Sequence, residues 1–474
     1  MGLAWLRTRQ YSDGSWRGSV GITALCALAF LNAGYDETDQ DVSQAIQYIL
    51  SRVHSDGSIF GDYYYRTYET SLAVLALVAT HNDAYRTIID NARNWLVNSQ
   101  WDEDCLWGSV NKDSWFYGGF GYGRNVRPDL SNTQWALMAL DAAGLPLDDP
   151  TWKKAQIFLA RCQNRHTTVT IDFGDGSSYT VQPYSWQSND GGFIYYPGAS
   201  LAGGTKSYGS MTAAGIWSLL LCGVDVNDPR LKGDDTIKGA LDWIADHYTW
   251  DLNPGMPSYM SQRFVYYYYV TLSKALTMAR LTKVNEHDWY QDLNNKLVSL
   301  QHPDGYWVSS YTGHGSEYIP ELATAYSILA LQTRAATPPA QRLSYLTFIL
   351  RSNCLIRVID PNGNLVGYNY MTGLGENHIP TAVYSGPFFE PQYIVIISPE
   401  AGTYRLELIG ISEGPYELSI QGNYGGEITD TFEYTGYIKP AELHGSDITI
   451  TAIVGPLDIY TPVSYTHLTL PTKA

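Results

Sequence analysis

The stretch Gln10-Tyr-Ser-Asp-Gly-Ser-Trp16 decides the fold, because related stretches return along the chain. They are Val53-His-Ser-Asp-Gly-Ser-Ile59, Asn189-Asp-Gly-Gly-Phe193 and Gln301-His-Pro-Asp-Gly-Tyr-Trp307, and residues 99–108 hold a degenerate copy. Such self-similarity predicts a repeat architecture. The Gly should adopt a positive φ and the Trp should cover the Gln amide, so we interpret the turn as a structural staple rather than a catalytic motif.

Two kinds of helix are predicted around these turns. Amphipathic outer helices precede them at 41–53, 84–99, 151–162, 235–248 and 287–300. Ala-rich helices that are apolar on nearly all faces follow them, each opened by a Thr at 23, 70, 133, 212 or 324, and a sixth covers 266–281. Helices that need burial on every face, alternating with amphipathic ones, predict a mainly α fold, an (α/α)6 toroid or double ring, over residues 1–337.

A second, all-β part is predicted after about residue 338. Alternating apolar and polar residues at 355–368, 393–397, 402–410, 416–422 and 447–454 predict strands, and we expect a small β-sandwich over 346–460. The segment Asp360-Pro-Asn-Gly-Asn364 has the composition of a turn rather than of a calcium site. Residues 464–474 resemble translated adaptor sequence and are expected to be a non-native tail, and we also expect the natural start of the chain to be missing.

The composition excludes several classes of partner. The net charge is −17 and no run of Lys or Arg offsets it, so binding to nucleic acid is not expected. No apolar run is long enough to span a bilayer, which requires about 18 residues. The five cysteines lack Cys-x-x-Cys spacing, so neither a zinc finger nor a disulfide framework is indicated.

The Gln…Asp-Gly-Ser-Trp turns and the Ala-rich helices resemble the QW repeats of squalene and hopene cyclases over roughly residues 1–335. Gly119-Phe-Gly-Tyr-Gly123 and Arg127-Pro-Asp-Leu-Ser-Asn-Thr-Gln134 are similar to segments of bacterial proteins with prenyltransferase and squalene-oxidase repeats. The resemblance implies the α-α toroid of the terpenoid cyclase and protein prenyltransferase superfamily.

The same resemblance puts the usual chemistry of these enzymes in doubt. The cyclases carry Pro-Asp-x-Asp-Asp-Thr, whose middle Asp protonates the polyene, but here Ser131 replaces that donor and Asn132 replaces the third carboxylate. The prenyltransferases bind zinc through Asp-x-Cys and a distant His, and Glu103-Asp-Cys105 with His302 or His314 matches that pattern poorly. We therefore expect no metal and no cofactor.

A ligand site is expected in the centre of the ring, at the starts of the inner helices. The catalytic candidates are Asp129, Glu69 and His314. The ligand-binding candidates are Tyr68, Asn132, Gln134, Lys206, Tyr208, Tyr267, Glu317 and Glu321. Structural roles compete with these: Asp129 suits a helix N-cap, and carboxylates in a first turn favour the helix dipole. Of the four rings at 266–269, at most two can face a cavity.

Two kinds of function remain open. One is an enzyme that acts on a terpenoid, and the other is an exported, secreted or cell-surface protein that binds a glycan or peptide in its cavity, with a glycan-acting enzyme as its variant. A cavity lined mainly by Phe, Trp and Leu would favour the terpenoid. A cavity crossed by Tyr, Asn, Asp and Gln would favour the polar ligand, which is our preferred interpretation.

Overall fold

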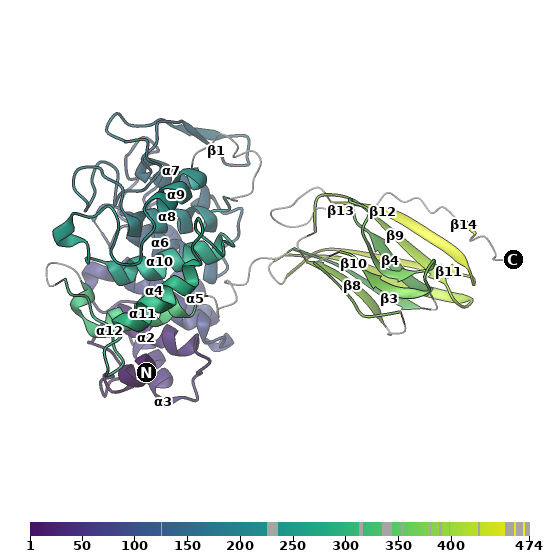
Figure 1. Cartoon of the computed structure of the whole chain (residues 1–474), viewed down its shortest axis with the longest axis horizontal. Helices are drawn as coiled ribbons and strands as arrows, with labels where there is room; N and C mark the ends of the chain where they lie inside the picture. The colour runs from purple at the N-terminus through teal and green to yellow at the C-terminus, as the bar shows by residue number, and fades with distance from the viewer. Residues whose placement is uncertain are drawn as a thin grey trace. The chain divides into compact units, whose positions relative to one another are not determined.

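The computed structural model describes residues 1–124, 126–224, 236–311, 316–333, 344–352, 354–379, 381–387, 391–397, 399–424, 427–450, 459–460 and 468–469. The chain divides into two compact units, Met1–Pro339 and Ala340–Ala474 (Figure 1). The predicted limits at 337 and 346 lie close to this division, and the predicted tail lies almost wholly outside the described residues. None of the described helices is long and apolar enough to cross a membrane.

Six buried helices form the inner wall of the first unit. They are α2 (Val20–Leu31), α4 (Arg66–Ala79), α6 (Leu130–Ala142), α8 (Gly209–Leu221), α10 (Val265–Met278) and α12 (Pro320–Leu331). Each contacts the next in this order, and α12 contacts α2, so the ring is closed. Small Ala side chains allow this close approach, and burial on nearly every face explains why the helices show no apolar stripe.

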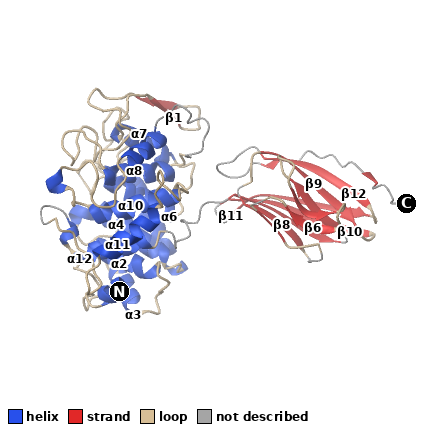
Figure 2. Ribbon diagram, in the orientation of Figure 1, coloured by secondary structure: helices blue, strands red, loops and turns tan. Residues whose placement is uncertain are grey.

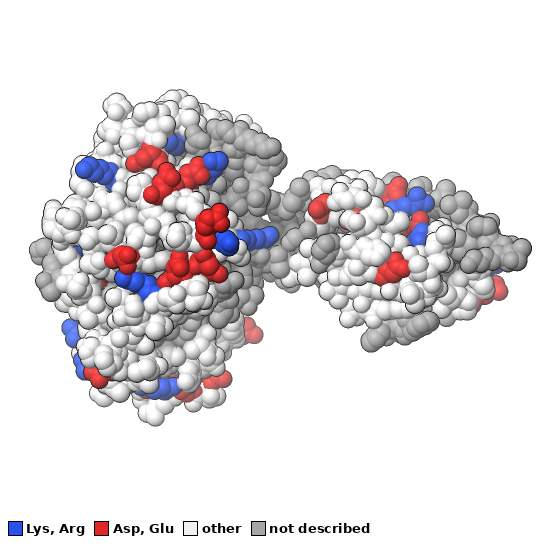
Figure 3. Space-filling model, viewed as in Figure 1, with Lys and Arg blue, Asp and Glu red and all other residues white. Residues whose placement is uncertain are grey.

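A second set of helices packs outside the first. Figure 2 shows that this unit is largely helical. The second set comprises α1 (Gly2–Arg7), α3 (Gln40–Leu50), α5 (Arg86–Ser99), α7 (Pro150–Cys162), α9 (Thr236–Asp246) and α11 (Trp289–Leu300), each packed against an inner helix. Short 3-10 helices at Tyr63–Tyr65, Asp83–Tyr85, Ser258–Met260 and Ser316–Tyr318 connect these elements, and β1 (Val169–Asp172) and β2 (Ser178–Val181) form a hairpin that the sequence pattern did not predict. On the face in Figure 3, charged side chains are scattered over a largely uncharged surface.

The threonines of the inner helices do not open them, which corrects the prediction. Each lies in the fourth or fifth position of its helix, while Ser19 and Asp129 are the N-caps of α2 and α6. The Thr hydroxyl instead accepts a hydrogen bond from the backbone N–H two residues after the turn glycine. Five such bonds measure 3.0–3.1 Å, from residues 16, 59, 120, 193 and 307 to Thr23, Thr70, Thr133, Thr212 and Thr324. One Thr per repeat thus fixes the turn to the following inner helix.

The third turn uses a different glycine from the one predicted. Gln100 donates to the carbonyl of Gly118 at 2.8 Å and to that of Thr151 at 3.0 Å, and Gly118 has a φ of +84°. The prediction placed this turn at 99–108, because residues 101–117 are inserted between the Gln and its glycine. A Cβ at Gly118 would lie 1.8 Å from the carbonyl oxygen of Lys154, so only glycine fits there.

Two antiparallel sheets form the second unit. One contains β3 (Ser344–Ser352), β7 (Ala382–Tyr384), β8 (Gln392–Ile397), β10 (Gly414–Tyr424) and β11 (Glu427–Ile438) in the order β11-β10-β3-β8-β7. The other has the order β13-β12-β9-β4-β5-β6, with β14 paired to β12. Its strands are β4 (Cys354–Ile359), β5 (Leu365–Asn369), β6 (Leu374–Asn377), β9 (Gly402–Gly410), β12 (Glu442–Ile450), β13 (Ile459–Tyr460) and β14 (Leu468–Thr469). Phe348 and Ile420 of the first sheet share one buried hydrophobic cluster with Ile356 and Leu406 of the second.

Candidate functional site

A cavity of about 800 Å³ opens at the N-terminal ends of the inner helices, and all six contribute to its wall. Its described lining is Ser19, Ile22, Tyr65, Tyr68, Glu69, Tyr122, Ser131, Trp135, Tyr195, Leu201, Tyr208, Ser210, Met211, Phe264, Tyr267, Glu317, Tyr318, Ile319, Leu322 and Tyr326. Cavities of this size hold small organic ligands. The cavity therefore lies where the sequence pattern predicted it, at the starts of the buried helices.

Tyrosine dominates the lining, with eight of the twenty residues. The hydroxyl groups of Tyr68 and Tyr326 are 3.1 Å apart, and the hydroxyl of Tyr267 donates to Oε1 of Gln134 at 2.7 Å. Burial raises the pKa of Tyr68 to about 12, so its hydroxyl stays protonated. The side chain of Tyr208 is 1% exposed, and its hydroxyl has no hydrogen-bond partner among the described residues.

Trp135 lies at the centre of the aromatic wall. Its ring stacks on Tyr326, with centroids 6.4 Å apart, and contacts Tyr68 and Tyr267 at 6.4 and 6.3 Å. Its indole N–H is buried and, like the Tyr208 hydroxyl, finds no acceptor in the described part of the chain. Buried polar groups are normally hydrogen-bonded, so these two donors lack the acceptor that such groups usually have.

Glu69 has a structural task. Its Oε1 accepts from the N–H of Gly21 at 3.2 Å and from the hydroxyl of Ser19 at 3.1 Å, and its Oε2 accepts from the N–H groups of Gly61 and Asp62 at 2.8 and 3.0 Å. The side chain thus holds the N-terminus of α2 against the start of α4.

Glu317 holds the start of α10 in a related way. Its carboxylate accepts from the N–H groups of Tyr266 at 3.2 Å and Tyr267 at 2.6 Å. Burial nevertheless outweighs these bonds and raises the pKa of Glu317 to about 8. The carboxyl of Glu317 can therefore carry a proton near neutral pH.

Asp129 is the N-cap of α6 and is not part of the described lining. Its Oδ1 accepts from the N–H of Asn132 at 2.9 Å and its Oδ2 from the Asn132 amide at 2.7 Å. Burial raises the pKa of Asp129 to about 6 in spite of these bonds and one from Tyr195. The structural role weighed for this residue is the one that its contacts support. Ser131, which stands where cyclases carry their acid, does line the cavity.

Four other predicted residues are not part of the described lining. Asn132 bonds Asp129, Gln134 accepts from Tyr267, Lys206 is exposed, and Glu321 pairs with Nε of Arg9 at 3.2 Å. His314 lies outside the described residues. Tyr266, Tyr268 and Tyr269 donate to backbone carbonyls of loops, so one ring of that run, Tyr267, faces the cavity.

The lining residues that the sequence analysis missed include seven aromatic ones: Tyr65, Tyr122, Trp135, Tyr195, Phe264, Tyr318 and Tyr326. Trp135 lies four residues after Ser131 and three after Asn132, the spacing that puts side chains on one helix face, and that spacing was the available signal for it. Tyr326 lies five residues after Glu321, so no such spacing indicated it.

No cluster of three or more His, Cys, Asp or Glu side chains that could hold a metal ion occurs in the described residues. Glu103, considered as a zinc ligand, instead accepts from the hydroxyl of Tyr117 at 2.8 Å and lies 3.5 Å from Nζ of Lys154. Cys105 is buried in its loop, and burial raises the pKa of its thiol.

Several known proteins are similar to this chain. A family model, the squalene-hopene cyclase C-terminal domain, matches residues 17–180. The squalene--hopene cyclase of Zymomonas mobilis is 34% identical over 165 residues, which is 34% of this chain and 24% of that relative. The chain thus spans about a quarter of the length of this curated relative.

The solved structures with a similar fold have low TM-scores. Candida albicans protein geranylgeranyltransferase-I has a TM-score of 0.44 at 15% identity and covers 69% of this chain and 85% of its own. The α-1,6-mannanase GH76A of Salegentibacter has a TM-score of 0.44 at 9% identity and covers 70% and 97%. The type II terpene cyclase MstE of Scytonema has a TM-score of 0.40 at 12% identity and covers 71% and 96%. The predicted resemblance to the squalene cyclase-like superfamily is confirmed, on the sequence match of residues 17–180.

Proposed function

We propose that the helical unit binds a neutral, hydroxyl-rich ligand, an oligosaccharide, in its central cavity. The observation that carries this proposal is the tyrosine lining with two buried donors that have no described partner, the Tyr208 hydroxyl and the Trp135 indole N–H. Sugar hydroxyls accept and donate hydrogen bonds, and sugar ring faces pack on aromatic rings.

The charges of the cavity support a neutral ligand. Among its described lining residues, Glu69 and Glu317 are the two with acidic side chains. No Lys or Arg, which could hold a diphosphate, is among them. Both carboxylates already serve backbone N–H groups, so an uncharged ligand leaves their bonds intact. We include in the proposal that the protein acts outside the cytoplasm, secreted or at the cell surface. The β-unit supports this location, because such units are often appended to exported proteins, and cell fractionation tests it.

The experiment is native mass spectrometry of the full chain, incubated separately with neutral oligosaccharides and with polyprenols. We expect an oligosaccharide adduct that Tyr208→Phe weakens by about tenfold, the loss of one hydrogen bond in a dry site. The variant should melt at the same temperature as the parent, since the hydroxyl has no described partner to lose. Tyr269→Phe is the matched control: it loses the bond to the Trp250 carbonyl and some stability, but it should keep full affinity. Retention of polyprenol alone contradicts the proposal.

A second candidate, acid chemistry on a polyprenoid, has one observation in its favour. Glu317 lines an aromatic cavity and, with its pKa raised to about 8, carries a proton at neutral pH. Glu317 holds its proton more tightly in the folded chain than in the unfolded chain. This contribution to stability is lost as the pH rises from about 4.5 to about 8, so the free energy of unfolding falls over that range. Glu317→Gln should flatten this dependence in denaturant titrations. Conversion of a polyprenol by the parent and not by this variant would favour the enzyme.

A further inference from the structure

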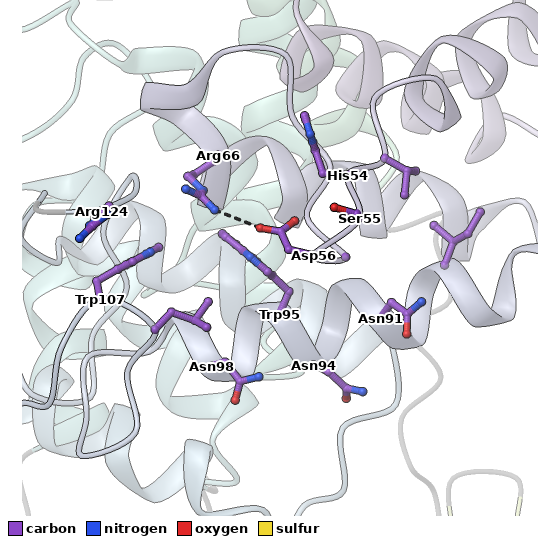
Figure 4. Close-up of a pocket in the computed structure, with 14 residues that line it drawn as sticks. His54, Ser55, Asp56, Arg66, Asn91, Asn94, Trp95, Asn98, Trp107 and Arg124 are labelled. Carbon is purple, nitrogen blue, oxygen red and sulfur yellow. Dashed lines mark hydrogen bonds and ion pairs between the residues drawn. The ribbon is translucent and has the colours of Figure 1, made fainter.

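A second pocket of about 580 Å³ lies against the outer helix α5, beside the turn 53–59 (Figure 4). In the turn 10–16, the amide of Gln10 donates to the carbonyl oxygens of Gly14 at 2.9 Å and Asp41 at 2.8 Å, which ties the turn to the next outer helix. The corresponding position in the second turn holds Val53, which cannot form such a tie. Val53 and Ile88 of α5 both line the pocket, so the space lies where this repeat lacks its tie.

One wall of the pocket is aromatic and rigid. The rings of Trp95 and Trp107 meet edge to face with centroids 6.2 Å apart. Trp95 is 3% exposed and the guanidinium of Arg66 lies over it, 5.1 Å from its centroid. Figure 4 shows Asp56 pointing toward Arg66 above Trp95, and the two charges are 3.3 Å apart. Trp95 supports Trp107 from behind, and the half-buried indole of Trp107, flanked by polar groups, suits the apolar face and hydroxyl edge of a sugar ring.

Polar side chains surround this wall. Asn91, Asn94 and Asn98 are exposed on α5 at spacings of three and four, so they lie on one side of the helix. Each amide offers a donor and an acceptor, the pair that a sugar hydroxyl requires. A peptide would use the same amides, but it has no need of the paired indoles.

The charges of the pocket do not cancel. Burial alone would raise the pKa of Asp56, but hydrogen bonds from Ser58 and the charge of Arg66 outweigh burial, and the net pKa is lowered. Asp56 therefore stays ionised and offsets the charge of Arg66. Arg124 is exposed at the edge of the pocket, and no carboxylate lies within ion-pair distance of it in the described part of the chain. One positive charge therefore remains, in a chain whose net charge is −17.

We propose that this pocket binds a sugar residue that carries a carboxylate, with its ring against Trp107 and its carboxylate at Arg124. The site is separate from the central cavity and does not rest on the function proposed for it. The ligand proposed here carries a negative charge, whereas the ligand proposed for the central cavity is neutral.

The test is calorimetric titration of the full chain with trigalacturonic acid, with neutral maltotriose and with an acidic tripeptide. We expect trigalacturonic acid to bind, and Arg124→Gln to weaken it by about tenfold, the usual effect of one charge-assisted hydrogen bond. Added salt should weaken binding to the parent and have a smaller effect on this variant. Arg127→Gln is the matched control, an exposed arginine three residues away that bonds Tyr196 and does not line the pocket.

Two further variants keep the test decisive. Asn98→Ala changes an exposed residue of α5 and should also weaken binding if Arg124→Gln is poorly folded. Tyr208→Phe, in the central cavity, should leave the affinity for trigalacturonic acid unchanged. The proposal is overturned by absence of binding at millimolar ligand, by equal affinity in Arg124→Gln, by equal affinity for the acidic tripeptide, or by loss of binding in Tyr208→Phe.

Discussion

The turns at 10–16 and 53–59 have the same backbone course and differ in three side chains, of which Gln10 against Val53 and Trp16 against Ile59 matter for packing. Gly14 and Gly57 have φ values of +85° and +91°, and the N–H groups of Trp16 and Ile59 both donate to a threonine hydroxyl at 3.0 Å. The first turn adds the Gln10 amide and the Trp16 indole, which donates to the carbonyl of Leu6 at 2.8 Å. The second has Val53 and Ile59 in these places.

This difference separates what forms a turn from what fills it. The glycine, the threonine and the Asp-to-Ser bond that both turns share fix the course of the backbone without the Gln and the Trp. The Gln and Trp side chains add a tie to the next outer helix and volume in the wall. Where the tie is absent a pocket lies beside the turn, so loss of a structural side chain and gain of a candidate site occur at the same place.

The largest expected effect is at Trp16. Trp16→Ala removes a fully buried indole and leaves the Leu6 carbonyl without its donor, and we expect it to lower the free energy of unfolding by about 4 kcal/mol. Ile59→Ala, at an equally buried position with a smaller side chain and no such bond, should cost about 3 kcal/mol. Urea unfolding followed by circular dichroism measures both. Equal losses would mean that the indole bond adds nothing.

Glycine substitutions compare how closely the two turns approach their outer helices. A Cβ at Gly14 would lie 2.2 Å from the carbonyl oxygen of Gln44, whereas one at Gly57 would lie 2.8 Å from that of Asn91. Both positions also carry a positive φ, which costs about 1 kcal/mol for alanine. We expect Gly14→Ala to cost about 3 kcal/mol and Gly57→Ala less. Thermal unfolding of the two variants gives the order, and a larger loss for Gly57→Ala would contradict it.

Loss of the tie itself should have a moderate effect. Gln10→Ala leaves the carbonyls of Gly14 and Asp41 without that donor, and we expect a loss of about 2 kcal/mol. Gln47→Ala, on the exposed side of α3, is the control for a glutamine on the nearby surface and should change the stability by less than about 0.5 kcal/mol. A similar change in both variants would show that the amide bonds are not stabilising.

The smallest stability change is expected where a tie is built in. Val53→Gln should raise the free energy of unfolding by about 1 kcal/mol if the new amide bonds a carbonyl of α5. The longer side chain should also fill part of the pocket beside the turn 53–59. Denaturant titration measures the gain, and the same protein should bind trigalacturonic acid more weakly. Tighter binding, or no change in either quantity, would break the link between the missing tie and the pocket.

The sequence was sufficient for the helices and for the position of the central cavity. Apolar periodicity encodes which face of a helix is buried, so the inner and outer sets were predicted to within a few residues, as for α7 at Pro150–Cys162 against 151–162. The glycine of the third turn was misplaced because periodicity carries no information on the length of the insertion at 101–117. The threonines were misread because a hydroxyl that binds a distant N–H has the same local sequence as a cap.

The site residues were harder to predict than the fold. Which side chain of an inner helix points to the axis depends on how six helices close the ring, and no local pattern carries that rotation. Gln134 and Tyr267 illustrate this: both start inner helices, but Tyr267 reaches the cavity and Gln134 bonds it from behind. Strand β11 was missed because its polar residues and Thr obscure the apolar alternation.

Two sites of different charge on one helical unit are the central claim, and simultaneous binding tests it most directly. Native mass spectrometry of the full chain in a mixture of a neutral oligosaccharide and trigalacturonic acid reports each bound mass. The predicted result is a complex that contains one molecule of each. Complexes that hold one ligand or the other but never both, at concentrations that saturate each alone, would mean a single site and would contradict the claim.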